Sequence, residues 1–159
     1  MCVSSHPLSM AQLQWQCTES SGSHALPYVG DLPMDFTQHH EGTPMYKNNT
    51  SCTYKVTTDP NHCVTVFIGY TMTEGTPGSC DPNDPNQDVL TVSQRGLPVD
   101  YYCGVWVYAS FARTSRLLGE GVEMSWAANA SPSQNERGIF LIITEGGSSD
   151  CGFSGNLLC

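Results

Sequence analysis

Charged side chains are scarce in this sequence, and positive charges are the scarcer kind. Lys and Arg together number 6 against 15 Asp and Glu, which gives a formal net charge of −9 at pH 7. Proteins that bind nucleic acid or anionic membrane surfaces need many basic side chains to neutralise phosphates. The composition therefore argues against both kinds of partner and is compatible with cation binding.

The patterns of several other protein classes are also missing. The sequence has no run of 18 apolar residues, so we expect no membrane-spanning helix. It has no Gly-x-Ser-x-Gly motif and no Cys or His set at zinc-finger spacing. We predict no catalytic residue and no enzymatic activity, although a triad assembled in space from its Ser and His residues stays open at this point.

Cysteine is abundant, and its distribution is informative. The eight cysteines stand singly at positions 2, 17, 52, 63, 80, 103, 151 and 159. An even number of isolated cysteines is typical of disulfides formed in an oxidising compartment. N-glycosylation motifs at Asn48, Asn49 and Asn129 also favour secretion. The motifs at Asn48 and Asn49 overlap, so only one of these two residues is expected to carry a glycan. We therefore predict a secreted, extracellular glycoprotein.

Apolar residues alternate with other residues along several short segments. The clearest is 63–72, and 52–57 and 122–127 follow the same period of two, which is typical of β-strands with two different faces. Residues 139–144 are apolar on both faces, as in a central strand. Further strands are expected at 87–92, 101–111 and 32–36. Turn-forming residues separate these runs and no helical periodicity occurs, so the sequence predicts an all-β sandwich or jelly roll of antiparallel strands.

The order and spacing of these segments resemble those of a CUB domain. The matching elements are Cys52-x-x-x-Val56, the alternating strand 64–72, Glu74, Cys80, Asp88-x-Leu90-x-Val92, Tyr102-Cys103-Gly104, Val122-x-Met124-x-Trp126 and Gly138-Ile-Phe140. The resemblance covers residues 17–146 and implies a disulfide-stapled, CUB-like β-sandwich (jelly roll), similar in architecture to the spermadhesins. Residues 1–16 are then an N-terminal extension or arm, and residues 147–159 a C-terminal tail tethered by disulfides.

The chain departs from the family pattern at two places. It lacks the Ser-Pro-x-Tyr-Pro element usual after the first cysteine, and its loop between Cys80 and Asp88 is longer and richer in Asn, Asp and Pro. The chain therefore resembles a divergent, invertebrate-like single CUB protein.

The resemblance also implies a disulfide pattern. It pairs Cys17 with Cys52 and Cys80 with Cys103, and similarity to some invertebrate CUB-like proteins adds Cys63 with Cys151, which leaves Cys2 with Cys159. Sequence alone permits 105 pairings of eight cysteines. A bridge from Cys2 or Cys159 to a neighbouring chain is the open alternative.

Many CUB domains bind Ca²⁺, and the resemblance assigns the corresponding ligand positions to Glu74, Asp88 and Asn129. The first two supply hard carboxylate oxygens, which Ca²⁺ prefers. Asn129 offers only a neutral amide oxygen and lies in a glycosylation motif, so Asp81 or Asp84 is the alternative third ligand. Ca²⁺ is thus the candidate cofactor, against the simpler reading of a solvated acidic turn.

Other chemistry-bearing residues are expected to be structural. Adjacent histidines on a strand point to opposite sides, so His39-His40-Glu41 is interpreted as a surface cluster rather than a zinc site. Trp15 is expected to pack on a partner. The remaining aromatic residues are expected in the core or half-buried, with sugar or protein contact as the alternative: Tyr101, Tyr102, Trp106, Tyr108 and Trp126.

Two functional hypotheses follow. The first is a non-catalytic structural subunit that assembles with copies of itself into an extracellular fibre or matrix, with the arm 1–16 laid along a neighbour. The second is a recognition module for an extracellular protein or glycan, in which Ca²⁺ would order the loops that meet the partner.

Overall fold

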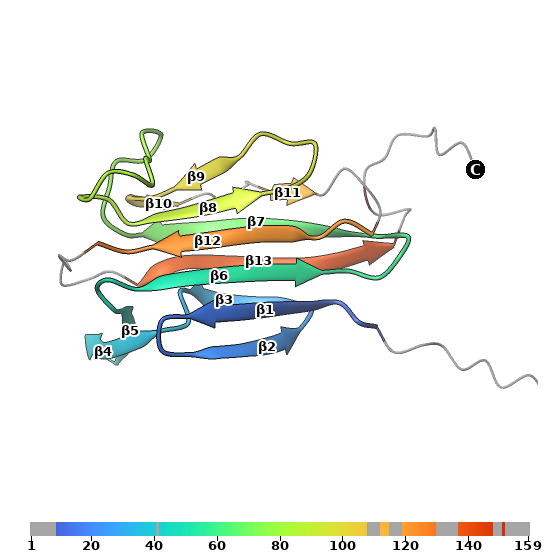
Figure 1. The fold of residues 1–159 in the computed structure, drawn as a ribbon, viewed down its shortest axis with the longest axis horizontal. Coiled ribbons are helices and arrows are strands. Elements are labelled where there is room, and N and C mark those ends of the chain that lie inside the picture. The colour runs from blue at the N-terminus through green and yellow to red at the C-terminus, as the bar shows by residue number, and fades with distance from the viewer. Residues whose placement is uncertain are drawn as a thin grey trace, which may run out of the picture.

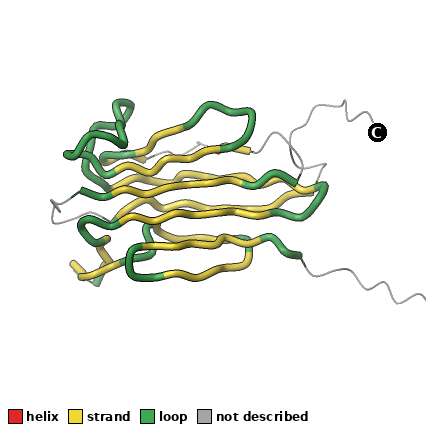
Figure 2. Tube along the Cα trace, in the orientation of Figure 1, coloured by secondary structure: helices red, strands yellow, loops and turns green. Residues whose placement is uncertain are grey.

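The structure is a computed structural model, and it describes residues 9–40, 42–107, 112–114, 119–129, 137–147 and 151. Strands and loops make up all of the described chain, which contains no helix (Figure 2). No membrane-crossing helix is therefore found in this part of the protein.

The strands form two large sheets and one small hairpin, and every pairing is antiparallel. The six-stranded sheet has the order β2 (Ser21–Ala25), β1 (Gln12–Cys17), β6 (Ser51–Thr57), β12 (Val122–Ala127), β8 (Val89–Ser93) and β9 (Asp100–Tyr102). The five-stranded sheet has the order β10 (Val105–Val107), β7 (His62–Met72), β13 (Gly138–Gly147) and β3 (Tyr28–Leu32), with β11 (Ala112–Thr114) also paired to β7. The hairpin joins β4 (Phe36–His40) to β5 (Thr43–Tyr46).

The core lies between the two large sheets. Alternate residues of β6 and β12 point inward, as the burial pattern of each strand shows. They meet the inward side chains of β7 and β13 in one continuous cluster that contains Tyr54, Trp126, Ile68 and Leu141. The protein is thus a β-sandwich, as the alternation of the sequence predicts.

The central strands lie where the sequence predicts them, whereas two of the weaker strand predictions need correction. The predicted strand 101–111 is divided after Tyr102. Gly104 has a φ of 77° and turns the chain between β9 and β10. Residues 108–111 lie outside the described residues. The predicted strand 32–36 is wrong: Leu32 ends β3 and Phe36 begins β4, with Pro33 between them.

The predicted arm 1–16 also needs correction, because its second half belongs to the sandwich. Residues Gln12–Cys17 form β1, which is hydrogen-bonded between β2 and β6. Leu13 is fully buried. Trp15 packs on its own sheet, since a Cβ added at Gly22 would lie 2.5 Å from the Trp15 ring, and it is only partly buried. At the other end of the predicted sandwich, β13 continues to Gly147, one residue past position 146.

Three disulfides tie the sandwich together. They join Cys17 to Cys52, Cys63 to Cys151 and Cys80 to Cys103, which are three of the four pairs that the resemblance implied. Cys17 and Cys52 are direct neighbours across β1 and β6. The expected pair Cys2–Cys159 falls outside the described residues.

Candidate functional site

Glu74, Asp88 and Asn129 converge at the end of the sandwich where β7 and β12 end and β8 begins. These strand ends lie on the left in Figure 1. The Asn129 side-chain amide donates to Glu74 Oε2 at 2.6 Å, and the Asn129 backbone N–H donates to Asp88 Oδ1 at 2.6 Å. Glu74 and Asp88 lie at the two ends of the loop between β7 and β8, and Asn129 follows β12, so the fold brings the three together. They are the positions that the sequence singled out as candidate calcium ligands.

Backbone hydrogen bonds hold the two ends of the β7–β8 loop against each other. The Asp88 N–H donates to the Glu74 carbonyl at 3.1 Å, and the buried Thr73 hydroxyl donates to the Asp88 carbonyl at 3.1 Å. The same hydroxyl accepts the Gly104 N–H at 2.9 Å. The carboxylates therefore project from a fixed backbone rather than from freely moving turns.

Two glycines and a disulfide allow this close packing. Gly75, which follows Glu74, has a φ of 128°, and a Cβ there would lie 2.8 Å from Cys103 Sγ. A Cβ at Gly104 would meet the Gly75 carbonyl oxygen at 2.8 Å. The bridge from Cys103 to Cys80 fixes the other side of the loop. Larger residues at either glycine would push Glu74 away from Asp88.

A fourth residue, Tyr46, was missed by sequence reasoning. Its hydroxyl donates to Asp88 Oδ2 at 2.5 Å, and its ring makes an edge contact with Trp126 at a centroid distance of 4.9 Å. Tyr46 ends β5, in a hairpin that has no counterpart among the predicted strands. Its spacing from Asp88 carries no recognisable signal, so only the folded structure reveals the contact.

The electrostatics of this cluster favour a cation. Burial raises the pKa of Asp88 and the nearby Glu74 carboxylate raises it further, while the hydrogen bonds from Tyr46 and Asn129 act in the opposite direction. Among the described residues, no Lys or Arg forms an ion pair with either carboxylate. Two nearby carboxylates and an amide form a donor set that suits Ca²⁺.

The alternative third ligands lie elsewhere in the same loop. Asp81 and Asp84 each accept a backbone N–H from the residue two positions later, from Asn83 and Asn86 respectively, at 2.9 Å. The Asn86 N–H lowers the pKa of Asp84. Both carboxylates therefore stabilise turns of the long loop, and the structure brings neither into contact with Glu74.

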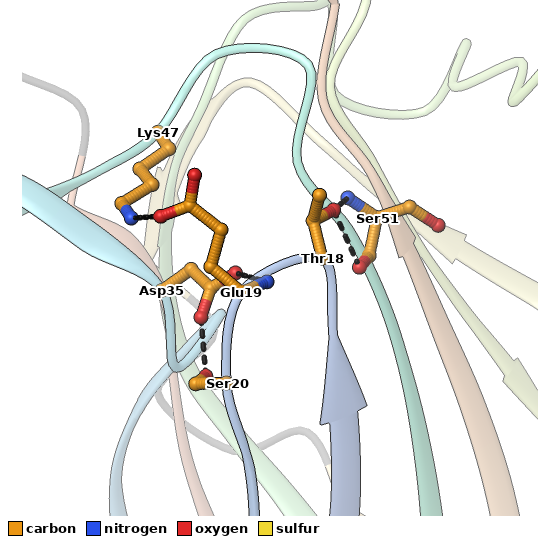
Figure 3. Close-up of polar contacts among 6 residues, drawn as sticks. All are labelled: Thr18, Glu19, Ser20, Asp35, Lys47 and Ser51. Carbon is orange, nitrogen blue, oxygen red and sulfur yellow. Dashed lines mark hydrogen bonds and ion pairs between the residues drawn. The ribbon is translucent and has the colours of Figure 1, made fainter.

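A second polar cluster lies at the same end, where the turn after β1 meets the chain before β6 (Figure 3). The buried Asp35 carboxylate accepts the Glu19 N–H at 3.0 Å and the Ser20 hydroxyl, and Lys47 pairs with Glu19. Cys17 and Cys52 place their sulfur atoms beside Asp35, but both sulfurs are joined in a disulfide and no thiolate is available for a metal. This cluster therefore holds loops together.

The other residues singled out in the sequence divide between surface and core. His39 is exposed on β4, while the His40 side chain and Glu41 are not among the described parts. Tyr102 and Trp126 are buried, whereas Tyr101 and Trp106 are exposed, and Tyr108 falls in an undescribed segment.

The glycosylation motifs lie close to the acidic cluster. Asn48 and Asn49 are exposed just before β6, and the Asn49 N–H donates to the Asn129 carbonyl at 2.8 Å. A glycan on Asn129 would be attached through the amide nitrogen that now contacts Glu74. A glycan there would leave one N–H on this nitrogen and would place its first sugar beside Glu74.

A cavity of about 590 Å³ lies at the opposite end, where β6 and β8 end and β12 begins. Its lining includes Lys55, Arg95, Glu120 and the buried Gln94. Neither polar atom of the Gln94 amide has a hydrogen-bond partner. This amide is the clearest unsatisfied polar group in the described core.

Comparisons of the chain with protein-family models, with curated proteins and with solved structures found no match. The fold and the cysteines define the class as an all-β sandwich stapled by disulfides.

Proposed function

We propose that this protein is a secreted, non-catalytic, CUB-like recognition module that binds Ca²⁺ through Glu74, Asp88 and Asn129. The observation that supports it is the convergence of these three residues, with Tyr46, at the loop end of the sandwich. The motifs of the sequence that resemble a CUB domain support the same proposal.

Bound Ca²⁺ would supply positive charge between the two carboxylates and order the loops that carry them. The chain's own residues prepare this arrangement. Tyr46 and the Asn129 backbone each donate to one Asp88 oxygen, which orients the carboxylate. Rotation of the Asn129 amide would exchange its nitrogen for its oxygen toward Glu74. The ordered acidic rim would then meet a Lys or Arg of an extracellular protein, or the hydroxyls of a glycan.

Thermal unfolding in calcium chloride and in EDTA tests the calcium site. We expect calcium to raise the melting temperature of the wild type, because a ligand that binds only the folded state stabilises it by about 2.7 kcal/mol at 100 times its Kd. Glu74→Gln should remove the shift. Asp81→Asn is the matched control, since it neutralises a carboxylate of the same loop that lies outside the cluster. Equal shifts in all three proteins would reject the site.

A second candidate function is self-assembly into a fibre or matrix, and the exposed apolar surface of the five-stranded sheet favours it. Val105 and Val107 on β10 are 71% and 72% exposed, and Trp106 between them is 53% exposed. Val29 and Phe67 on the same sheet are also exposed. Apolar surface of this kind is typical of protein contact sites.

Negative-stain imaging of purified protein tests self-assembly. We expect polymers of the wild type, and single particles when Val105→Lys and Val107→Lys are combined. Val99→Lys is the matched control, because it places the same charge on another exposed valine. Single particles of the wild type at all concentrations would reject this second function and leave the calcium proposal untouched.

A further inference from the structure

We propose a second metal site, for a divalent transition-metal ion, formed by Asp59, His62 and Glu145 at the end of the sandwich opposite the calcium cluster. One ligand atom from each of these three side chains lies within 4.8 Å of the other two. All three side chains are half-buried. The site is independent of the proposed calcium function.

The fold brings these residues together from two strands and a turn. Asp59 and His62 are the first and last residues of the turn before β7, closed by a hydrogen bond from the His62 N–H to the Asp59 carbonyl at 3.2 Å. Pro60 and Asn61 form its centre, and Asn61 has a φ of 64°, which a type II turn requires at its third residue. Glu145 lies near the end of β13, in register with Val64 of β7.

The histidine is oriented as a ligand. Nδ1 of His62 lies 3.0 Å from the Pro60 carbonyl oxygen. A carbonyl can only accept, so this contact requires a proton on Nδ1, and in the neutral form of the ring Nε2 then has the lone pair. Ligating histidines usually donate their second ring N–H to such a backbone oxygen, which fixes the tautomer that a metal needs.

The two carboxylates are oriented by donors rather than neutralised by cations. Asp59 Oδ1 accepts the Met10 N–H at 2.8 Å. Glu145 Oε2 accepts the Thr58 hydroxyl at 2.5 Å and the Asp59 N–H at 2.9 Å. Within the described residues, neither carboxylate forms an ion pair with Lys or Arg. Two carboxylates and one imidazole therefore lie together, and no Lys or Arg of the described residues is paired with either carboxylate.

The donor set selects the kind of ion. Ca²⁺ takes oxygen ligands, whereas one imidazole with two carboxylates suits Zn²⁺ and similar divalent ions. Ligands of a tetrahedral zinc ion at about 2.05 Å lie about 3.4 Å apart. Side-chain movements of roughly 0.7 Å would bring atoms at most 4.8 Å apart to that spacing. Three protein ligands leave a fourth position for water or a partner's side chain.

Titration calorimetry of the full chain with zinc chloride, in a buffer that contains calcium chloride, tests this site. We expect His62→Ala to bind one zinc ion fewer per chain than the wild type. Asp59→Asn, which keeps the acceptor for the Met10 N–H, should weaken binding at that site at least tenfold. The melting temperature of each variant in EDTA verifies that it is folded.

His39→Ala is the matched control, because it removes an exposed imidazole from a different part of the fold. This variant should bind zinc at the Asp59, His62 and Glu145 site with the affinity of the wild type. In NMR spectra of the wild type, zinc should shift the resonance of Nε2 of His62. Wild-type stoichiometry and affinity in His62→Ala, or no binding by the wild type at millimolar zinc, would overturn the proposal.

Discussion

At the scale of single residues, Asp88 shows how burial and charge oppose each other. Burial and Glu74 raise its pKa above the ordinary value of 3.8. The folded protein then binds this proton more tightly than the unfolded chain does. The stabilising effect of protonated Asp88 is complete below pH 3.8 and is lost as the pH rises through the raised pKa.

The variant Asp88→Asn tests this effect, because its amide is always neutral and can still accept the Asn129 N–H. In EDTA at pH 7 we expect the variant to be more stable than the wild type, with a difference that disappears as the pH falls to about 3.8. Calcium chloride should reverse the order at pH 7. Urea unfolding across this pH range measures the difference, and a constant difference would contradict the raised pKa.

Gln94 is the second residue with a direct prediction. Its side-chain amide is buried and has no hydrogen-bond partner. A buried unsatisfied polar group costs about 1–3 kcal/mol, so Gln94→Met should raise the free energy of unfolding by about that amount. Guanidinium unfolding measures it, with the exposed Gln14→Met as control. A loss of stability would show that the amide is bonded in solution.

The sequence predicted part of the candidate site at this scale. Glu74, Asp88 and Asn129 were found because each has a position within a family-like motif. Tyr46 was missed because it lies in a hairpin with no such motif. The proximity of Asp59, His62 and Glu145 was missed because it depends on the register of β13 against β7. Contacts set by tertiary register leave no local pattern in the sequence.

At the scale of elements, β1 is the most informative strand. Leu13, Trp15 and Cys17 alternate along it as in a strand, but the resemblance to a CUB domain begins at residue 17, so residues 1–16 were interpreted as an arm. Leu13 is fully buried. We expect Leu13→Ala to lower the free energy of unfolding by about 2–5 kcal/mol, measured by urea unfolding. A free arm would give a change close to zero.

Strands β2 and β4 were not predicted for a different reason. All five residues of β2 are exposed, so no apolar alternation marks it. The central strands β6, β7, β12 and β13 were predictable because each buries a regular subset of its side chains. Period-two patterns identify strands that face a core and not those that only extend a sheet.

The three disulfides close loops of different length, which predicts how strongly each one stabilises the fold. The loop is 88 residues long for Cys63–Cys151, 35 for Cys17–Cys52 and 23 for Cys80–Cys103. In the chain-entropy treatment these loops correspond to about 4.6, 3.8 and 3.4 kcal/mol. Replacing each pair by alanines should destabilise the protein in that order in guanidinium unfolding. A larger loss for the shortest loop would contradict the entropic ranking.

At the scale of the whole molecule, the two candidate metal sites lie at opposite ends of one rigid sandwich (Figure 1). One offers two carboxylates and an amide, and the other two carboxylates and an imidazole. Different ions are therefore expected to bind at different ends. The protein has a net charge of −9, so cations bound at both sites would also reduce the electrostatic repulsion within the folded protein.

The bridges also decide how the molecule would respond to a pulling force. Tension applied between residues 12 and 151 would pass from β1 through the sulfurs of Cys17 and Cys52 into β6, and leave β7 at Cys63 for Cys151. Apart from β1 itself, only the stretch between Cys52 and Cys63 can lengthen, by roughly 40 Å at most. Force spectroscopy should record a gain of that order under oxidising conditions and one about ten times longer after reduction. The oxidised protein would therefore lengthen far less under load than the reduced one.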